Sequence, residues 1–211
     1  MDKIFSVTRR QHCIMAPIVA AALFSGCSAP QTGEPQTGAA TSPKTTTKDS
    51  APKTPRVGDI APDFELMNLQ DEKIKLSAMA AKGPVVLVVL RGYPGYQCPI
   101  CTVQVGQLFG QAKAFEKAKA RVLLVYPGPS KELKKRADEF VKGKTLPANF
   151  DLILDPDYQF VNQYALRWDA PNETAYPSTF VLDNARKVRF AKVSKTHGDR
   201  AVIREIIAAL P

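Results

Sequence analysis

The sequence predicts an α/β domain in which helices flank a central mixed β-sheet, and two features of the chain support this fold class. Val85–Leu90 is a run of six apolar residues, mostly β-branched, which is typical of a central strand with both faces buried. Val122–Tyr126 is a second such run, and apolar residues at helical spacing lie between the two. Strand, helix and strand in this order predict a parallel βαβ unit with a right-handed crossover.

A short antiparallel hairpin is expected ahead of this unit as an N-terminal extension. Phe64 and Leu66 alternate with charged neighbours, and Ile74 and Leu76 repeat the pattern after a turn at residues 70–71. Alternation with a period of two is the pattern of a half-buried strand.

The rest of the domain is expected to alternate between helices and short apolar strands. The helix of the βαβ unit begins at Cys98 and extends to about Ala120. The later elements are, in chain order, a helix capped by Ser130 that ends near Val141, a strand at 152–154, a helix capped by Asp155 or Asp157 that ends near Tyr164, a strand pair at 179–182 and 188–193, and a final helix capped by Asp199.

The composition fits one folded domain and does not point to a nucleic-acid partner. The chain has 211 residues, 45% of them hydrophobic, which is enough for one sizeable core. The formal net charge is +9, but residues 57–211 carry only +5 of it, and no basic run is interleaved with aromatic residues. We therefore expect a basic solvated surface rather than a nucleic-acid interface.

Residues 1–27 have the layout of an export signal. A basic start is followed by the apolar run Cys13–Phe24 and then by Ser25-Gly26-Cys27. The apolar run is too short to cross a bilayer of about 30 Å as a helix. The segment resembles a bacterial lipoprotein signal, which implies cleavage before Cys27 and a lipid on that cysteine. The alternative is ordinary cleavage near the same place, which would release a soluble periplasmic protein.

Residues 28–56 are expected to form a disordered tether. The segment is rich in Thr, Pro, Lys, Gln, Ala and Ser and contains no aromatic residue. Such a composition buries too little apolar surface to offset the entropy lost on ordering. Together with a lipid on Cys27, it predicts an exported protein anchored to a bacterial membrane, whose domain, residues 57–211, faces the periplasm or the exterior.

Cys98 and Cys101 carry the chemistry that the sequence indicates. They follow a buried strand and open a helix, where unpaired N–H groups and the helix dipole stabilise a thiolate. Residues three apart on a helix lie on one face, within disulfide range, and Pro99 is tolerated in the first turn. A C-x-x-C pair beside a βαβ unit is typical of a redox-active dithiol on a thioredoxin-like fold.

Two other roles for the pair are less favoured. A structural zinc site needs four ligands, and after signal cleavage only Cys27, Cys98, Cys101 and His197 remain as candidates, without a second C-x-x-C pair. A structural disulfide stays open as an alternative, although a bridge across two residues constrains the unfolded chain little. We expect no metal, and no motif indicates haem, flavin or nucleotide binding.

Residues 57–210 resemble the alkyl hydroperoxide reductase and thiol-specific antioxidant family, the peroxiredoxin-like branch of the thioredoxin fold. Val57–Phe64 is similar to the family's opening Gly-x-x-Ala-Pro-x-Phe, and Ser178–Asp183 is similar to its strand near the active site. The central motif, Pro-x-x-x-Thr-x-x-Cys, is matched from Pro94 to Cys101.

The same motif implies roles for single residues. By the resemblance Cys101 is the peroxidatic cysteine and is followed by Thr102, as is common in the family. Cys98 takes the place of the motif's Thr, and Gln104 takes the place of the usual Glu. If Cys27 is lipidated, no third cysteine remains, so a sulfenic acid on one member of the pair is resolved within the chain only by the other.

One segment departs from the family pattern. Peroxiredoxins usually place an arginine just before the Thr-Phe strand, where this chain has Tyr176-Pro177. This resembles thioredoxins and membrane-tethered thiol-disulfide oxidoreductases, in which a cis proline packs against the dithiol, and it predicts a cis Pro177. The alternative is a trans proline that starts a strand. In thioredoxins the cysteine at the position of Cys98 is the nucleophile. The sequence therefore leaves open which of the two sulfurs attacks.

Arg91 is a further candidate, because it lies on the loop between the buried strand and Cys98. A cation there would favour a thiolate and orient a peroxide oxygen; the alternative is a surface arginine that ends a strand. Trp168 beside Arg167 is interpreted as a packed residue beside a surface cation, and His197 as a solvated loop histidine.

These observations predict a thiol-based oxidoreductase with antioxidant, peroxiredoxin-like activity. It would reduce peroxides through the Cys98/Cys101 dithiol and would need an external thiol reductant to reopen the resulting disulfide. The alternatives are a thioredoxin-like reductase of protein disulfides on the outer side of a membrane and a non-catalytic module with a structural Cys98–Cys101 bridge.

Overall fold

The structure of the protein is a computed structural model that describes residues 51–211. The predicted signal segment, its Cys27 and most of the predicted tether lie outside the described residues. The last residues assigned to the tether contact the domain, because the Thr54 hydroxyl donates to the Ala165 carbonyl at 3.1 Å and the Arg56 N–H donates to the Asp59 carboxylate at 2.9 Å. Within residues 51–211, no helix is long and apolar enough to cross a membrane.

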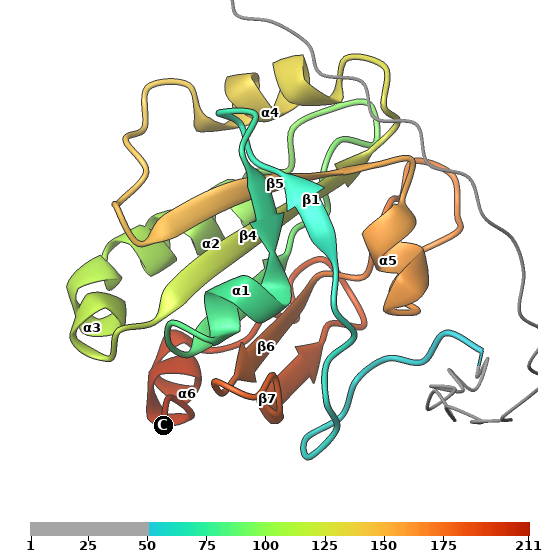
Figure 1. The fold of residues 1–211 in the computed structure, drawn as a ribbon. Helices are drawn as coiled ribbons and strands as arrows, with labels where there is room; N and C mark the ends of the chain where they lie inside the picture. Colours follow the sequence, from blue (N-terminus) through green and yellow to red (C-terminus); the bar gives the residue numbers. More distant parts are fainter. Residues whose placement is uncertain (1–50) are drawn as a thin grey trace, which may run out of the picture. The chain divides into compact units, whose positions relative to one another are not determined.

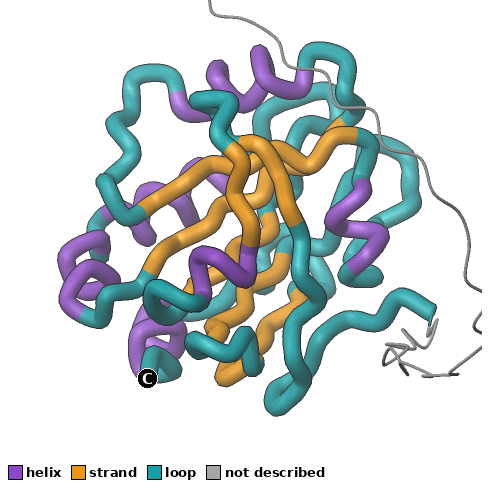
Figure 2. The backbone as a smooth tube through the Cα atoms, in the orientation of Figure 1, coloured by secondary structure: helices purple, strands orange, loops and turns teal. Residues whose placement is uncertain are grey.

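A five-stranded sheet with the strand order β5-β4-β3-β6-β7 forms the centre of the domain (Figures 1 and 2). The central strand β3 is parallel to β4, which is parallel to β5, and it is antiparallel to β6, which pairs with β7. The strands are β3 (Val85–Val89), β4 (Arg121–Gly128), β5 (Phe150–Pro156), β6 (Ser178–Leu182) and β7 (Val188–Val193). The predicted mixed sheet and its parallel βαβ unit are confirmed.

Helices cover both faces of this sheet, which explains why β3 is apolar throughout. Alternate side chains of β3 point to opposite faces: Val86 and Val88 pack into one core, and Leu87 and Val89 pack into the other. The first core contains residues of α2 (Pro99–Phe109), α3 (Ala112–Lys117), α4 (Leu133–Val141) and α6 (Ile203–Ala208). The second contains residues of α1 (Leu76–Ala80), α5 (Gln159–Gln163) and the hairpin β1 (Glu65–Met67) and β2 (Lys73–Lys75).

The N-terminal hairpin confirms the predicted alternation at Leu66 and Ile74, whereas Leu76, expected to continue the second strand, begins α1. Leu66 of β1 lies opposite Ile74 of β2 and both are buried, while the flanking Glu65 and Lys75 are exposed and paired in register. The hairpin therefore places one apolar row on the sheet and leaves one charged row in solvent.

Three helix boundaries differ from those predicted. The helix expected from Cys98 to about Ala120 is two helices, because Gly110, a poor helix former, follows α2, and Gln111 has a non-helical backbone. Ser130 does not cap α4 with its side chain; its carbonyl accepts the Leu133 N–H at 3.2 Å, and its own N–H donates to Asp157 at 2.8 Å.

Asp199 does not cap the final helix. α6 begins only at Ile203, and its N-cap residue is Val202. The Asp199 carboxylate instead accepts the Lys195 N–H at 3.2 Å and pairs with Lys192 at 2.5 Å. It thereby closes the turn that carries residues 195–199, which bears on the functional site.

Asp155 confirms the predicted capping of the short helix after β5. Its buried carboxylate accepts the N–H groups of Phe160 at 2.7 Å and Val161 at 3.1 Å. Burial raises the pKa of Asp155 from 3.8 to about 6, and these two hydrogen bonds offset only part of that shift.

The pH dependence of stability should report this buried carboxyl. Because its pKa is higher in the folded than in the unfolded chain, its contribution to stability is present below about pH 4 and is lost as the pH rises through about 6. Urea unfolding of the wild type and of Asp155→Asn between these pH values measures it. The wild type should lose stability relative to the variant over this range, and a constant difference would contradict the assignment.

Candidate active site

A tight turn at Gly92 positions the loop that leads from β3 to the cysteines. Gly92 has φ +70°, and a Cβ at this position would lie 1.8 Å from the carbonyl oxygen of Pro127 in β4. The Tyr93 N–H donates to that same carbonyl at 3.2 Å. Only glycine permits this backbone conformation at so close an approach, and the start of the loop is thereby fixed to the sheet.

Cys98 and Cys101 lie where the sequence predicts them, at the start of α2. Cys98 is the N-cap residue, and its sulfur accepts the N–H of Cys101 at 3.3 Å. Pro99 occupies the first helical turn, where its missing N–H costs no hydrogen bond. Both cysteines are free thiols, and they are only 3% and 1% exposed. The pair is therefore a dithiol enclosed by protein.

The two sulfurs differ in acidity. A hydrogen bond from the Cys101 thiol, the Cys101 N–H and the charges of Arg200 and Arg91 together lower the pKa of Cys98 to about 5, against the opposing effect of burial. Donating that hydrogen bond and burial raise the pKa of the Cys101 thiol. The pair thus carries one negative charge and one proton at neutral pH.

Two N–H donors are directed at the Cys101 sulfur. The backbone N–H of Arg91 lies 3.4 Å from it, and the Nη2 of Arg200 lies 3.6 Å from it. Arg200 also donates to the Gln104 side-chain oxygen at 2.8 Å and to the His197 carbonyl at 2.6 Å. Arg200 is a site residue that the sequence does not indicate, because its contact with Cys101 joins residues 99 positions apart and no local motif marks it.

Arg91 lies beside the cysteines as a buried ion-pair residue, so the alternative of a surface arginine that ends a strand is wrong. Its side chain is 2% exposed, and its guanidinium donates to Glu173 at 2.8 and 3.2 Å and to the Tyr96 hydroxyl. Burial opposes ionisation of Glu173, but hydrogen bonds from Arg91 and His197 outweigh it and hold the Glu173 pKa below its usual value. The guanidinium charge of Arg91 is therefore largely neutralised by this carboxylate.

His197 is not the solvated loop residue expected from the sequence. Its Nε2 lies 3.0 and 3.1 Å from the two Glu173 oxygens, and its ring lies 5.1 Å from that of Trp168. Trp168 is packed as predicted, since it stacks on Tyr176 at 4.7 Å. Contacts with Glu173 and Trp168, which lie on the segment before β6, hold the histidine in place, and a local sequence pattern does not reveal them.

The prediction of a cis Pro177 is wrong, because residues 51–211 contain no cis peptide bond. The chain enters β6 in extended form: the Pro177 carbonyl accepts the Ser194 N–H at 2.8 Å, and the Tyr176 N–H donates to Leu166 at 2.9 Å. These pairings, together with the Trp168–Tyr176 stack, favour a trans proline at the start of a strand. The alternative of a thioredoxin-like disulfide reductase thereby loses the feature that supported it.

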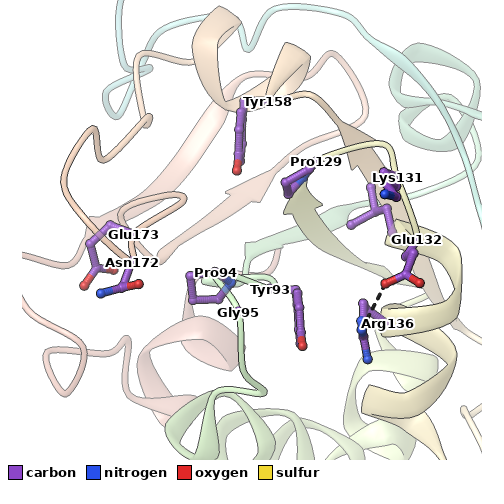
Figure 3. Close-up of a pocket in the computed structure, with 11 residues that line it drawn as sticks. Tyr93, Pro94, Gly95, Pro129, Lys131, Glu132, Arg136, Tyr158, Asn172 and Glu173 are labelled. Carbon is purple, nitrogen blue, oxygen red and sulfur yellow. Dashed lines mark hydrogen bonds and ion pairs between the residues drawn. The ribbon is translucent and has the colours of Figure 1, made fainter.

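Thr102 and Pro94, the other two predicted site residues, make no hydrogen bond to either sulfur among residues 51–211. The Thr102 hydroxyl donates back to the Cys98 carbonyl at 3.4 Å, as is common one turn into a helix. Pro94, on the loop between β3 and α2, lines a cavity of about 460 Å³ (Figure 3). Neither cysteine lines this cavity, which lies against Tyr93, Tyr158 and Arg136.

The acidity of the pair is measurable by alkylation. The rate of reaction with iodoacetamide should follow the thiolate fraction, rising with pH to a half-maximum near 5 and then staying level through neutrality, because the pKa of Cys98 is lowered to about that value. Cys98→Ser should remove this step and leave a thiol that ionises at higher pH. A wild-type midpoint near 9 would contradict the proposed stabilisation.

Comparisons with known proteins agree with this fold. The peroxidoxin BcpB of Mycobacterium tuberculosis superposes with a TM-score of 0.57 at 25% identity, covering 74% of this chain and 96% of that one. A peroxiredoxin-like protein of Aquifex aeolicus superposes with a TM-score of 0.61 at 16% identity, covering 74% and 86%. The domain therefore has the thioredoxin-like fold in the form seen in peroxiredoxins.

Sequence relatives cover part of the chain. Peroxiredoxin Bcp of Escherichia coli K12 is 32% identical over 111 residues, which are 53% of this chain and 65% of that protein. A Haemophilus influenzae protein with the same bcp designation is 35% identical over 111 residues, 52% of this chain and 64% of that protein. The chain thus spans slightly less than two thirds of these relatives. The AhpC/TSA family model matches residues 57–191, and the chain belongs to this family.

Proposed function

We propose that this protein is a thiol peroxidase that reduces peroxides with the Cys98/Cys101 dithiol. The observation that carries the proposal is the pair itself: two free, enclosed thiols lie at the start of α2, and two N–H donors face the Cys101 sulfur. Membership in the AhpC/TSA family and the likeness to peroxiredoxins support the same chemistry.

In the first step we assign the attack to Cys101. Its position matches the peroxidatic cysteine of the family motif, and its sulfur accepts the Arg91 N–H. At rest the charge lies on Cys98, so the Cys101 thiol has to give its proton to the Cys98 sulfur against the order of their pKa values, and the Arg91 N–H and the Arg200 guanidinium stabilise the charge that forms on Cys101. The Cys101 thiolate then attacks one peroxide oxygen, an S–O bond forms as the O–O bond breaks, and the leaving oxygen takes up a proton as an alcohol or water. The sulfur is oxidised to a sulfenic acid by two electrons.

In the second step Cys98 resolves the sulfenic acid. The Cys98 sulfur attacks the Cys101 sulfur, an S–S bond forms, the S–O bond breaks and water leaves. The 3.3 Å contact between the Cys98 sulfur and the Cys101 N–H keeps the two residues adjacent for this step. An external dithiol then reduces the disulfide by two thiol–disulfide exchanges and returns both thiols.

The site of action that we propose is outside the cytoplasm. The basic start, the apolar run and Ser25-Gly26-Cys27 support export and a lipid on Cys27, and the composition of residues 28–56 supports a tether to the membrane. Metabolic labelling with a radioactive fatty acid in a bacterial host tests this: label should enter the wild type and be absent from Cys27→Ala.

Trapping with a sulfenic-acid probe tests the proposed peroxidase chemistry. After one equivalent of peroxide, Cys98→Ser should accumulate a stable sulfenic acid at Cys101 and turn over at less than about a hundredth of the wild-type rate, because no resolving sulfur remains. Cys101→Ser should give little label, and the wild type should give the Cys98–Cys101 disulfide by mass spectrometry. A label that appears only in Cys101→Ser would assign the attack to Cys98 instead.

A further inference from the structure

Two arginines lie beside the cysteine pair, and their charges are in different states. The Arg91 guanidinium is held by the Glu173 carboxylate at 2.8 Å. Arg200 makes no ion pair with any carboxylate among residues 51–211; the groups that accept its N–H donors are the Gln104 amide oxygen, the His197 carbonyl and the Cys101 sulfur. Arg200 is therefore a cation beside the sulfurs whose charge no carboxylate neutralises.

Gln104 explains how Arg200 is held without losing this charge. It is 5% exposed and lies on α2 three residues after Cys101, so both side chains share one face of the helix. Its Oε1 accepts from Arg200 Nη1 at 2.8 Å while Nη2 of the same guanidinium faces the sulfur at 3.6 Å. A glutamate of the same shape at position 104 would place a negative charge against Arg200 and compete with the thiolate for it.

The turn that carries Arg200 is fixed at its other end. The Arg200 Nε donates to the carbonyl of His197, and the His197 ring contacts Glu173 at 3.0 Å. Glu173 thus fixes Arg91 directly and fixes the turn of Arg200 through His197. Tyr126 is a further titratable group close enough to Cys101 to respond to its charge, and burial raises its pKa so that it stays a neutral phenol.

We propose that Arg200 is the counter-charge of the Cys101 sulfur during attack on peroxide and that Gln104, being neutral, positions it there. This inference rests on the proposed peroxidase function and adds a residue from the segment between β7 and α6. Peroxiredoxins usually have an arginine just before β6, where this chain has Tyr176-Pro177. The proposal gives Arg200 the place of that missing cation beside the sulfur. It also makes Gln104, in place of the usual Glu of the family motif, a positioning residue with a defined purpose.

Four variants and one control test this assignment on the full-length protein. Arg200→Met removes the charge, and Arg200→Lys restores a charge without the two-pronged geometry. Gln104→Glu neutralises Arg200, whereas Gln104→Leu releases it from its position. The control is Arg204→Met. Arg204 is an exposed cation in the first turn of α6, and its side chain makes no ion pair or hydrogen bond in the part of the chain that the structure describes. Thermal unfolding of each variant reports whether the fold is kept.

The first readout is the rate of oxidation by hydrogen peroxide, compared with the rate of alkylation by iodoacetamide on the same protein. Removing a preorganised donor from a developing charge typically slows a reaction about 10²-fold or more. We expect Arg200→Met to slow oxidation by this order and alkylation much less, Arg200→Lys to recover part of the rate, and Arg204→Met to stay within about twofold of the wild type. Equal slowing by Arg200→Met and Arg204→Met would overturn the proposal.

The second readout is the pH titration of thiolate ultraviolet absorbance, which needs no peroxide turnover. The titration midpoint should move to higher pH in Arg200→Met and in Gln104→Glu, and it should stay unchanged in Arg204→Met. An unchanged midpoint in both Arg200→Met and Gln104→Glu would overturn the counter-charge role. If the wild type consumes no peroxide while these midpoints shift, the proposed peroxidase function fails and the assignment of Arg200 to the thiolate stands.

Discussion

The charge shared by two enclosed sulfurs is the constraint on which the rest of the site depends. An unpaired ionised group away from water is unfavourable by several kcal/mol, so the protein has to supply donors and cations around it. It does so from three segments: the N-terminus of α2, the backbone after β3 and, far along the chain, the turn before α6. The parallel βαβ unit brings the first two together, and the antiparallel pair β6–β7 brings the third.

Charge balance divides the surrounding polar residues into two groups. Arg91, Glu173 and His197 form a mutually neutralising cluster that joins the loop before Cys98 to the loop before β6. Arg200 and Gln104 form a second group, in which the only formal charge is that of the arginine. The first group joins two loops of the site, and of the two arginines it is Arg200, in the second group, that contributes more to lowering the Cys98 pKa. This division accounts for the presence of two buried or half-buried arginines within one small site.

Most of the fold could be predicted from the sequence, because the features concerned are local. The apolar runs of β3 and β4, the alternation in the hairpin and the spacing of Cys98 and Cys101 each depend on neighbouring residues. The misjudged features depend on contacts between distant ones. Arg91 meets Glu173 across 82 residues, Arg200 meets Cys101 across 99, and the trans Pro177 follows from its pairing with Ser194. The missed break at Gly110 is different, since a glycine between two apolar turns is a local signal.

Burial of the pair has a consequence for the fate of the oxidised sulfur. A sulfenic acid on Cys101 would form in a space with almost no solvent access, next to a sulfur one helical turn away. Two reactions then compete for the sulfenic acid, and they differ in kinetic order. Resolution by Cys98 is unimolecular, whereas further oxidation is bimolecular because a second peroxide has to enter. Such proximity corresponds to an effective molarity far above any physiological peroxide concentration. If Cys101 is oxidised as we propose, the enclosure that keeps both thiols from solvent also favours resolution by Cys98 over irreversible oxidation.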